Sequence, residues 1–91
     1  MISLEDCIAM CGLDRSEIDA IAEHEHVSEI AAAALASFLL HKAGGAREVR
    51  RMIVDDIRAA LSEKRLGHAT ELLMALRHFL NDYPDAAAPS V

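Results

Sequence analysis

The chain has 91 residues, of which 53% are hydrophobic but only 3% aromatic, and its net charge is −6. A chain of this length forms one small domain with a modest core, for which association with a second copy often adds stability. The acidic balance argues against nucleic-acid binding, which requires Lys and Arg to neutralise phosphates. Abundant alanine and few aromatic residues favour packed helices over a sheet, so we expect an all-α fold.

Two short helices are predicted in the N-terminal part of the chain. The first covers about residues 4–11, where both cysteines share one apolar stripe and are expected to pack as small core residues. The second follows Asp14, because Asp14 and Glu17 have the spacing of a capping box, and it runs to about Glu25.

A third helix is predicted from Glu29 to about Lys42, with Ser28 as its N-cap and a glycine pair after its end. Residues 30–40 carry no charge. A helix that is apolar all round has to be covered all round, so this helix is expected at the centre of a compact bundle of about five helices.

Two longer amphipathic helices complete the predicted domain, which spans residues 1–83. The fourth covers about residues 46–64 and the fifth about residues 68–81, with a break at Gly67 between them. Residues 84–91 begin with a proline and continue with small residues, so a flexible C-terminal tail is predicted there.

Charge is distributed unevenly along the chain. Residues 1–30 contain eight acidic side chains and one arginine, whereas residues 41–65 contain seven basic side chains and four acidic ones. Opposite charges at two ends of a chain favour contact within one subunit or across a symmetric dimer, so a homodimer is predicted. The apolar run is too short to span a bilayer and no signal peptide is visible, which predicts a cytoplasmic protein.

The segment AEHEHVSE contains the candidate metal ligands. Glu23 and His26 have the E-x-x-H spacing, which puts a carboxylate and an imidazole on one helical face, as in two-metal carboxylate bundles. His24 and His78 are further candidates, and a divalent iron, manganese or zinc ion is the predicted cofactor if these side chains converge. The alternative is structural: histidines at a helix C-terminus interact with its dipole, and the acids pair with arginines of the fourth helix.

The remaining function classes have less support in the sequence. A helix-turn-helix outline is present, but residues 29–40 offer only Glu29 and Ser37 as polar groups for contacting DNA. No glycine-rich phosphate loop or activated serine is recognisable, which argues against an enzyme that works without a metal. We therefore predict a non-catalytic protein-protein interaction or regulatory module, with a metal-binding helical bundle as the alternative.

The stretch AIAEHEHVSEIAAAALASFLL, together with LRHFL, resembles segments of a family of short, uncharacterised bacterial helical proteins. The resemblance covers most of the chain and includes the candidate ligands. It implies a bacterial cytoplasmic helical protein and brings no activity with it.

Overall fold

The computed structural model describes residues 13–87, which form four α-helices and one short 3₁₀ helix. In chain order they are α2 (Arg15–Glu25), α3 (Glu29–Leu40), α4 (Gly45–Ser62), α5 (Leu66–Asp82) and η1 (Pro84–Ala87). The predicted all-α fold is confirmed for these residues, and four predicted helices are present within a few residues of their expected bounds. The helix predicted over residues 4–11 lies outside the described residues.

Local capping explains where the first two of these helices begin. Asp14 accepts a hydrogen bond from the backbone N–H of Glu17 at 3.0 Å, and Glu17 accepts one from the backbone N–H of Asp14 at 3.0 Å, so the capping box is complete. The hydroxyl of Ser28 accepts a hydrogen bond from the backbone N–H of Ala31 at 3.2 Å and starts α3.

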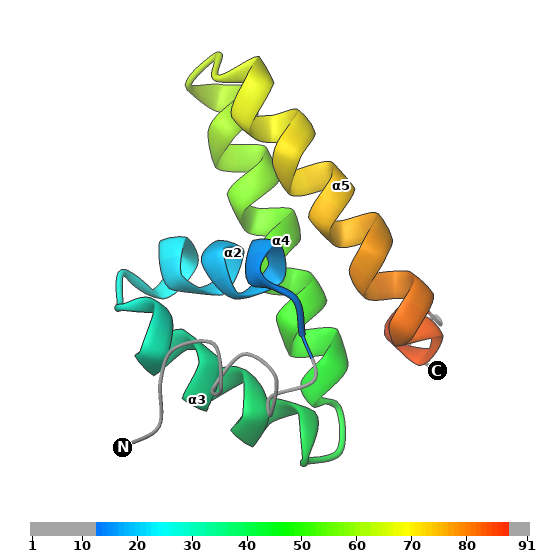
Figure 1. Ribbon diagram of the computed structural model, residues 1–91. Helices are drawn as coiled ribbons and strands as arrows, with labels where there is room; N and C mark the ends of the chain where they lie inside the picture. Colours follow the sequence, from blue (N-terminus) through cyan, green and yellow to red (C-terminus); the bar gives the residue numbers. More distant parts are fainter. Residues whose placement is uncertain (1–12, 88–91) are drawn as a thin grey trace.

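Helix α4 is the element against which all the others pack. It runs antiparallel to α5, and the two form a hairpin whose closed end extends beyond α2 and α3, as Figure 1 shows. Helices α2 and α3 cover the N-terminal half of α4 (Figure 1). Val49 and Ile53, on the apolar stripe of α4, are fully buried in the resulting core, as are Ile18 and Ile21 of α2.

The prediction that the third helix is central was wrong. Only one face of α3 is buried, and it consists mainly of small residues, Ala32, Ala33 and Ala36, which allow close packing on α2 and α4. On the opposite face Phe38 is 64% exposed. An apolar sequence without a polar face does not indicate which side will be covered, whereas the marked amphipathicity of α4 directs its stripe inward.

The break between the last two α-helices also differs from the prediction. The break between α4 and α5 occurs at Lys64, which has a left-handed backbone (φ 60°), and Gly67 lies inside α5. Residues 84–87, which open the predicted tail, form η1; it packs against α4 and α5 and buries Ala86. Tyr83, just before η1, stacks on Phe79 with ring centroids 5.0 Å apart.

Substitution of Gly45 by alanine is expected to destabilise the protein by about 1–3 kcal/mol, because the added methyl group overpacks the junction of α3 and α4. A Cβ atom at this position would lie 1.5 Å from the backbone oxygen of Leu39, which cannot move without shifting α3. Gly67→Ala is the matched control, since its Cβ would meet nothing within 4 Å and alanine favours the helix. Urea denaturation should therefore show opposite shifts, and equal effects of the two substitutions would contradict this packing.

Candidate functional site

The expected pairing of Glu23 with His26 on one helical face does not occur, because α2 ends at Glu25. His26 is the C-cap and has a left-handed backbone (φ 56°), and its N–H donates a hydrogen bond to the carbonyl of Ala22. The exposed side chain of His26 is therefore not in the helical position, three residues after Glu23, that would put both side chains on one face.

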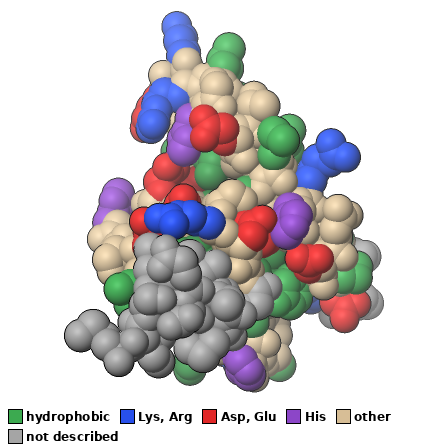
Figure 2. All heavy atoms as spheres, in the orientation of Figure 1, with side chains coloured by type: hydrophobic (Ala, Val, Ile, Leu, Met, Phe, Trp, Pro, Cys, Tyr) green, Lys and Arg blue, Asp and Glu red, His purple; other side chains and the backbone are tan. Residues whose placement is uncertain are grey.

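Glu23 pairs instead with a histidine of α5. Its Oε1 lies 2.5 Å from Nε2 of His68, which joins α2 to α5 across 45 positions of the chain. Beside this pair is a pocket of about 110 Å³, to which Asp19 and Glu71 contribute two more carboxylates. Figure 2 shows acidic and histidine side chains interleaved on this face of the molecule.

His24 points toward α4. Its Nε2 lies 3.3 Å from Oδ2 of Asp55, and Nη1 of Arg51 lies 3.1 Å from the same oxygen. Arg51 also pairs with Glu48 of its own helix. The acidic side chains of the AEHEHVSE segment were expected to pair with arginines of the fourth helix, but Glu23 pairs with His68, and His24 is linked to Arg51 through Asp55. His24 thereby helps to hold α2 on α4.

Asp56 is a buried carboxylate next to these pairs, although the sequence places it only at the edge of the apolar stripe of α4. Burial raises the pKa of its carboxyl to about 6, and the neighbouring Glu23 carboxylate adds to the rise. Its Oδ2 is buried and has no hydrogen-bond partner among the described residues. An ionised Asp56 therefore opposes the packing of α4 in this region.

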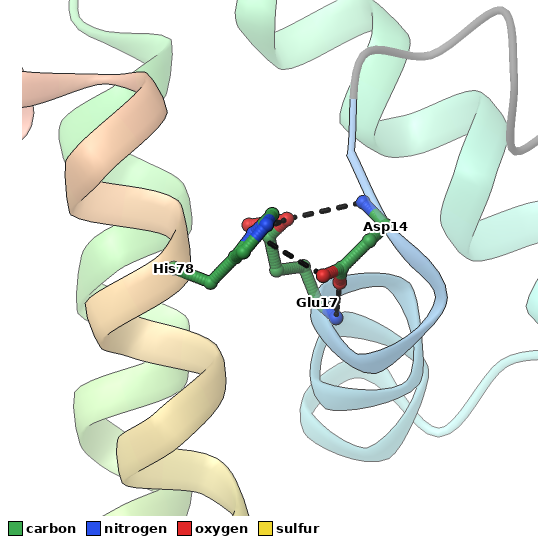
Figure 3. Close-up of side chains that lie close together, drawn as sticks. All are labelled: Asp14, Glu17 and His78. Carbon is green, nitrogen blue, oxygen red and sulfur yellow. Dashed lines mark hydrogen bonds and ion pairs between the residues drawn. The ribbon is translucent and has the colours of Figure 1, made fainter.

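His78, the fourth predicted ligand, joins a different group of side chains. Its Nδ1 lies 3.2 Å from Oδ2 of Asp14 and 3.3 Å from Oε1 of Glu17. Figure 3 shows the imidazole extending from α5 toward the two carboxylates at the start of α2. We call Asp14, Glu17 and His78 the α2–α5 cluster; within residues 13–87 it is the one group of three or more His, Cys, Asp or Glu residues whose ligand atoms lie within 4.8 Å of one another.

The electrostatics of the α2–α5 cluster follow from the burial of Glu17, whose exposed fraction is 0%. Burial raises the pKa of the Glu17 carboxyl to about 7, although the hydrogen bond from the Asp14 backbone opposes the rise. The Asp14 carboxylate, and then Glu17, raise the pKa of His78 above its usual value. Burial also acts to raise the pKa of Asp14, but hydrogen bonds from the Glu17 backbone and the Ser16 hydroxyl outweigh it, so this pKa is lowered.

This arrangement has two chemical capacities. Protonated at Nδ1, His78 donates to the carboxylates and links α2 to α5 as an ion pair. Deprotonated, the same nitrogen and the two carboxylates are one imidazole and two oxygen ligands, a set that binds divalent transition metals. The four residues predicted as ligands, Glu23, His24, His26 and His78, do not form a single ligand set.

Asp14 and Glu17 were recognised in the sequence only as a helix cap. A stronger signal was present, since Glu17 falls with Ile18 and Ile21 on the stripe that faces the core. A carboxylate on a buried stripe calls for a partner. The identity of that partner is not local information, because His78 is 61 positions away.

Comparison of the chain with known protein families, with curated proteins and with solved structures finds no match. Within the described part of the chain, none of the helices combines the length and the apolar composition that crossing a membrane requires.

Proposed function

We propose that this protein is a non-catalytic interaction module that associates with a second copy of itself through the free end of the α4–α5 hairpin. The observation that carries the proposal is the exposure of three leucines there: Leu61 is 51% exposed, Leu66 65% and Leu73 50%. They surround a groove of about 360 Å³. We call this surface the hairpin flank, lined by Ile57, Leu61, Leu66, Ala69, Thr70 and Leu73.

Contiguous exposed leucines are unusual for a small protein that functions alone. Single exposed apolar residues are common, whereas a continuous apolar patch marks an interaction site or an aggregation hazard. The hairpin flank lies where the hairpin extends past α2 and α3, and hydrophobic side chains reach the surface in that region of Figure 2. Its leucines gain burial only through a partner.

A second copy is the partner that fits this surface. Two antiparallel helices that present one apolar flank can pack on an identical pair by a two-fold axis, which forms a four-helix bundle. Helices α4 and α5 have 18 and 17 residues and are each about 25 Å long, so two such pairs can align side by side in one bundle. Leu66 and Leu73 are seven residues apart, as the residues of a helix–helix seam are.

The polar clusters support the non-catalytic part of the proposal. Glu17 caps α2 and pairs with α5, while His24 pairs with α4, so these titratable groups already have roles in holding the helices together. Such roles require no substrate.

Leu73→Lys is expected to weaken self-association at least tenfold, because a lysine ammonium would be buried in the interface without a partner. Sedimentation equilibrium should show a dimer for the natural protein and a shift toward monomer for the variant, with unchanged helical circular dichroism. Phe38→Lys is the matched control, since Phe38 is also an exposed large apolar residue but lies on α3.

Two results would overturn the proposal. A natural protein that stays monomeric at the highest soluble concentration has no self-association to explain. Dissociation by Phe38→Lys with no effect of Leu73→Lys would place the interface on α3 instead.

A further inference from the structure

We propose that Asp14, Glu17 and His78, the α2–α5 cluster, bind one divalent transition-metal ion, such as zinc or manganese, which links the N-terminus of α2 to α5. The inference rests on the placement of these ligand atoms and on the burial of Glu17, and it is independent of self-association.

The spacing of the cluster resembles that of ligands around a metal. Ligands about 2.1 Å from an ion are separated by about 3.0 Å at right angles and about 3.4 Å at the tetrahedral angle. The separations from His78 Nδ1 are 3.2 Å to Asp14 Oδ2 and 3.3 Å to Glu17 Oε1. Small side-chain rotations would therefore suffice to place these atoms around one ion.

A second observation comes from the free oxygen of Glu17. The residue is fully buried, and its Oε2 has no hydrogen-bond partner among the described residues. A buried carboxylate oxygen without a partner is costly. Figure 3 shows this carboxylate lying against the His78 ring. A cation bound there would neutralise the negative charge of the carboxylate, which the hydrogen bond of the capping box does not do.

Helix capping leaves carboxylate oxygens of Asp14 and Glu17 free to bind a metal ion. The cap uses Oδ1 of Asp14, which leaves Oδ2 available, and it uses one lone pair of Oε1 of Glu17, which leaves a second lone pair on that oxygen, while Oε2 of Glu17 takes no part in the cap. The side chain of His78 is half exposed, which gives the ion access and leaves room for water as a further ligand. Asp82, whose Oδ2 lies 3.8 Å from Nδ1 of His78, adds negative charge on the same side.

The donor set indicates the class of ion. One imidazole nitrogen with two carboxylate oxygens suits zinc, manganese or iron(II), whereas magnesium and calcium prefer oxygen ligands alone. Metal binding requires deprotonated ligands, so affinity should increase with pH.

The test is a calorimetric titration of zinc chloride into the untagged, chelator-treated full chain at pH 7.5. We expect one zinc per chain. His78→Gln and Glu17→Gln should each weaken binding at least tenfold, because each removes a ligand. Glutamine at position 17 can still accept the hydrogen bond from the backbone N–H of Asp14, so the helix cap is retained. His41→Gln is the control, since His41 is exposed on another surface and bonds to the Ser37 carbonyl.

Circular dichroism of each variant separates loss of the site from loss of the fold. The proposal fails if the natural chain binds no zinc, or if His78→Gln binds zinc as tightly as the natural chain. It also fails if His24→Gln or His26→Gln abolishes binding while His78→Gln does not, because the ion would then lie in the AEHEHVSE segment.

Discussion

Replacing Phe79 with alanine is expected to lower the free energy of unfolding by about 3–5 kcal/mol, the usual range for removal of a buried aromatic side chain. Phe79 is the largest fully buried side chain among the described residues, and it stacks on Tyr83. It lies on α5, which packs on α2, α4 and η1, so the cavity would weaken several contacts together.

The effect is large relative to the stability expected for this protein. A chain of 91 residues has a typical free energy of unfolding of about 5–14 kcal/mol, so Phe79→Ala would remove a large part of it. Urea denaturation followed by circular dichroism, at one protein concentration because association adds stability, measures the loss.

Met74→Ala is the matched control, because Met74 is on the same helix, is 66% exposed and does not line the hairpin flank, and its loss should stay within about 0.5 kcal/mol. If Phe79→Ala does not fold, Phe79→Leu, which leaves a smaller cavity, should show an intermediate loss. A loss below about 1 kcal/mol in Phe79→Ala, or equal losses in the alanine variants of Phe79 and Met74, would contradict the packing of α5 described above.

Replacing Glu17 with glutamine is expected to raise the free energy of unfolding at pH 8 by up to about 3 kcal/mol in metal-free buffer. Burial raises the pKa of the Glu17 carboxyl from 4.5 to about 7, and that difference measures the destabilisation caused by the buried charge. Glutamine occupies the same volume, remains neutral and can retain the capping hydrogen bond to Asp14.

The sign of the pH dependence follows from proton binding. Between pH 4.5 and 7 the folded protein holds the Glu17 proton that the unfolded chain has lost, so stability falls as the pH rises through this range. His78 acts in the same direction at higher pH: its raised pKa contributes stability that is complete below pH 6.5 and is lost as the pH rises through its folded pKa. Asp56, with a pKa raised to about 6, contributes a further decrease between pH 3.8 and 6.

Urea denaturation from pH 4.5 to 8 with a chelator present tests this dependence. The natural protein should lose stability across the range, and Glu17→Gln should lose much less between pH 6 and 8. The two proteins should agree within about 0.5 kcal/mol near pH 4.5, where the folded state holds a neutral Glu17. Glu71→Gln, which removes an exposed carboxylate of α5, is the control. Parallel curves for the natural protein and Glu17→Gln would contradict the burial of a titrating Glu17.

The helix bounds were predictable because they depend on residues close together in the chain. The capping box of Asp14 and Glu17 starts α2, and Ser28 starts α3. Gly44 supplies the positive φ before α4. Each of these signals depends on residues no more than three or four positions apart, so the residue types in the sequence are enough to recognise it. Reliance on residue type also explains one error. Glycine is the residue that most often adopts a left-handed backbone, so the break was predicted at Gly67, whereas Lys64 adopts that conformation.

The candidate site depends on long-range packing that local patterns do not encode. The E-x-x-H spacing of Glu23 and His26 suggested a shared face, but α2 ends between them, and Glu23 pairs with a residue 45 positions away. His78 meets Glu17 across 61 positions because α4 holds α2 and α5 on the same core.

The sequence by itself determined that this protein is helical and where most of its helices begin and end. The central helix and the partners of the buried and interhelical charges were decided by tertiary packing. The physical reason is that an apolar stripe predicts that a helix face is buried but does not identify the helix that covers it. In the same way, a buried charge requires a partner, but its own position does not identify that partner.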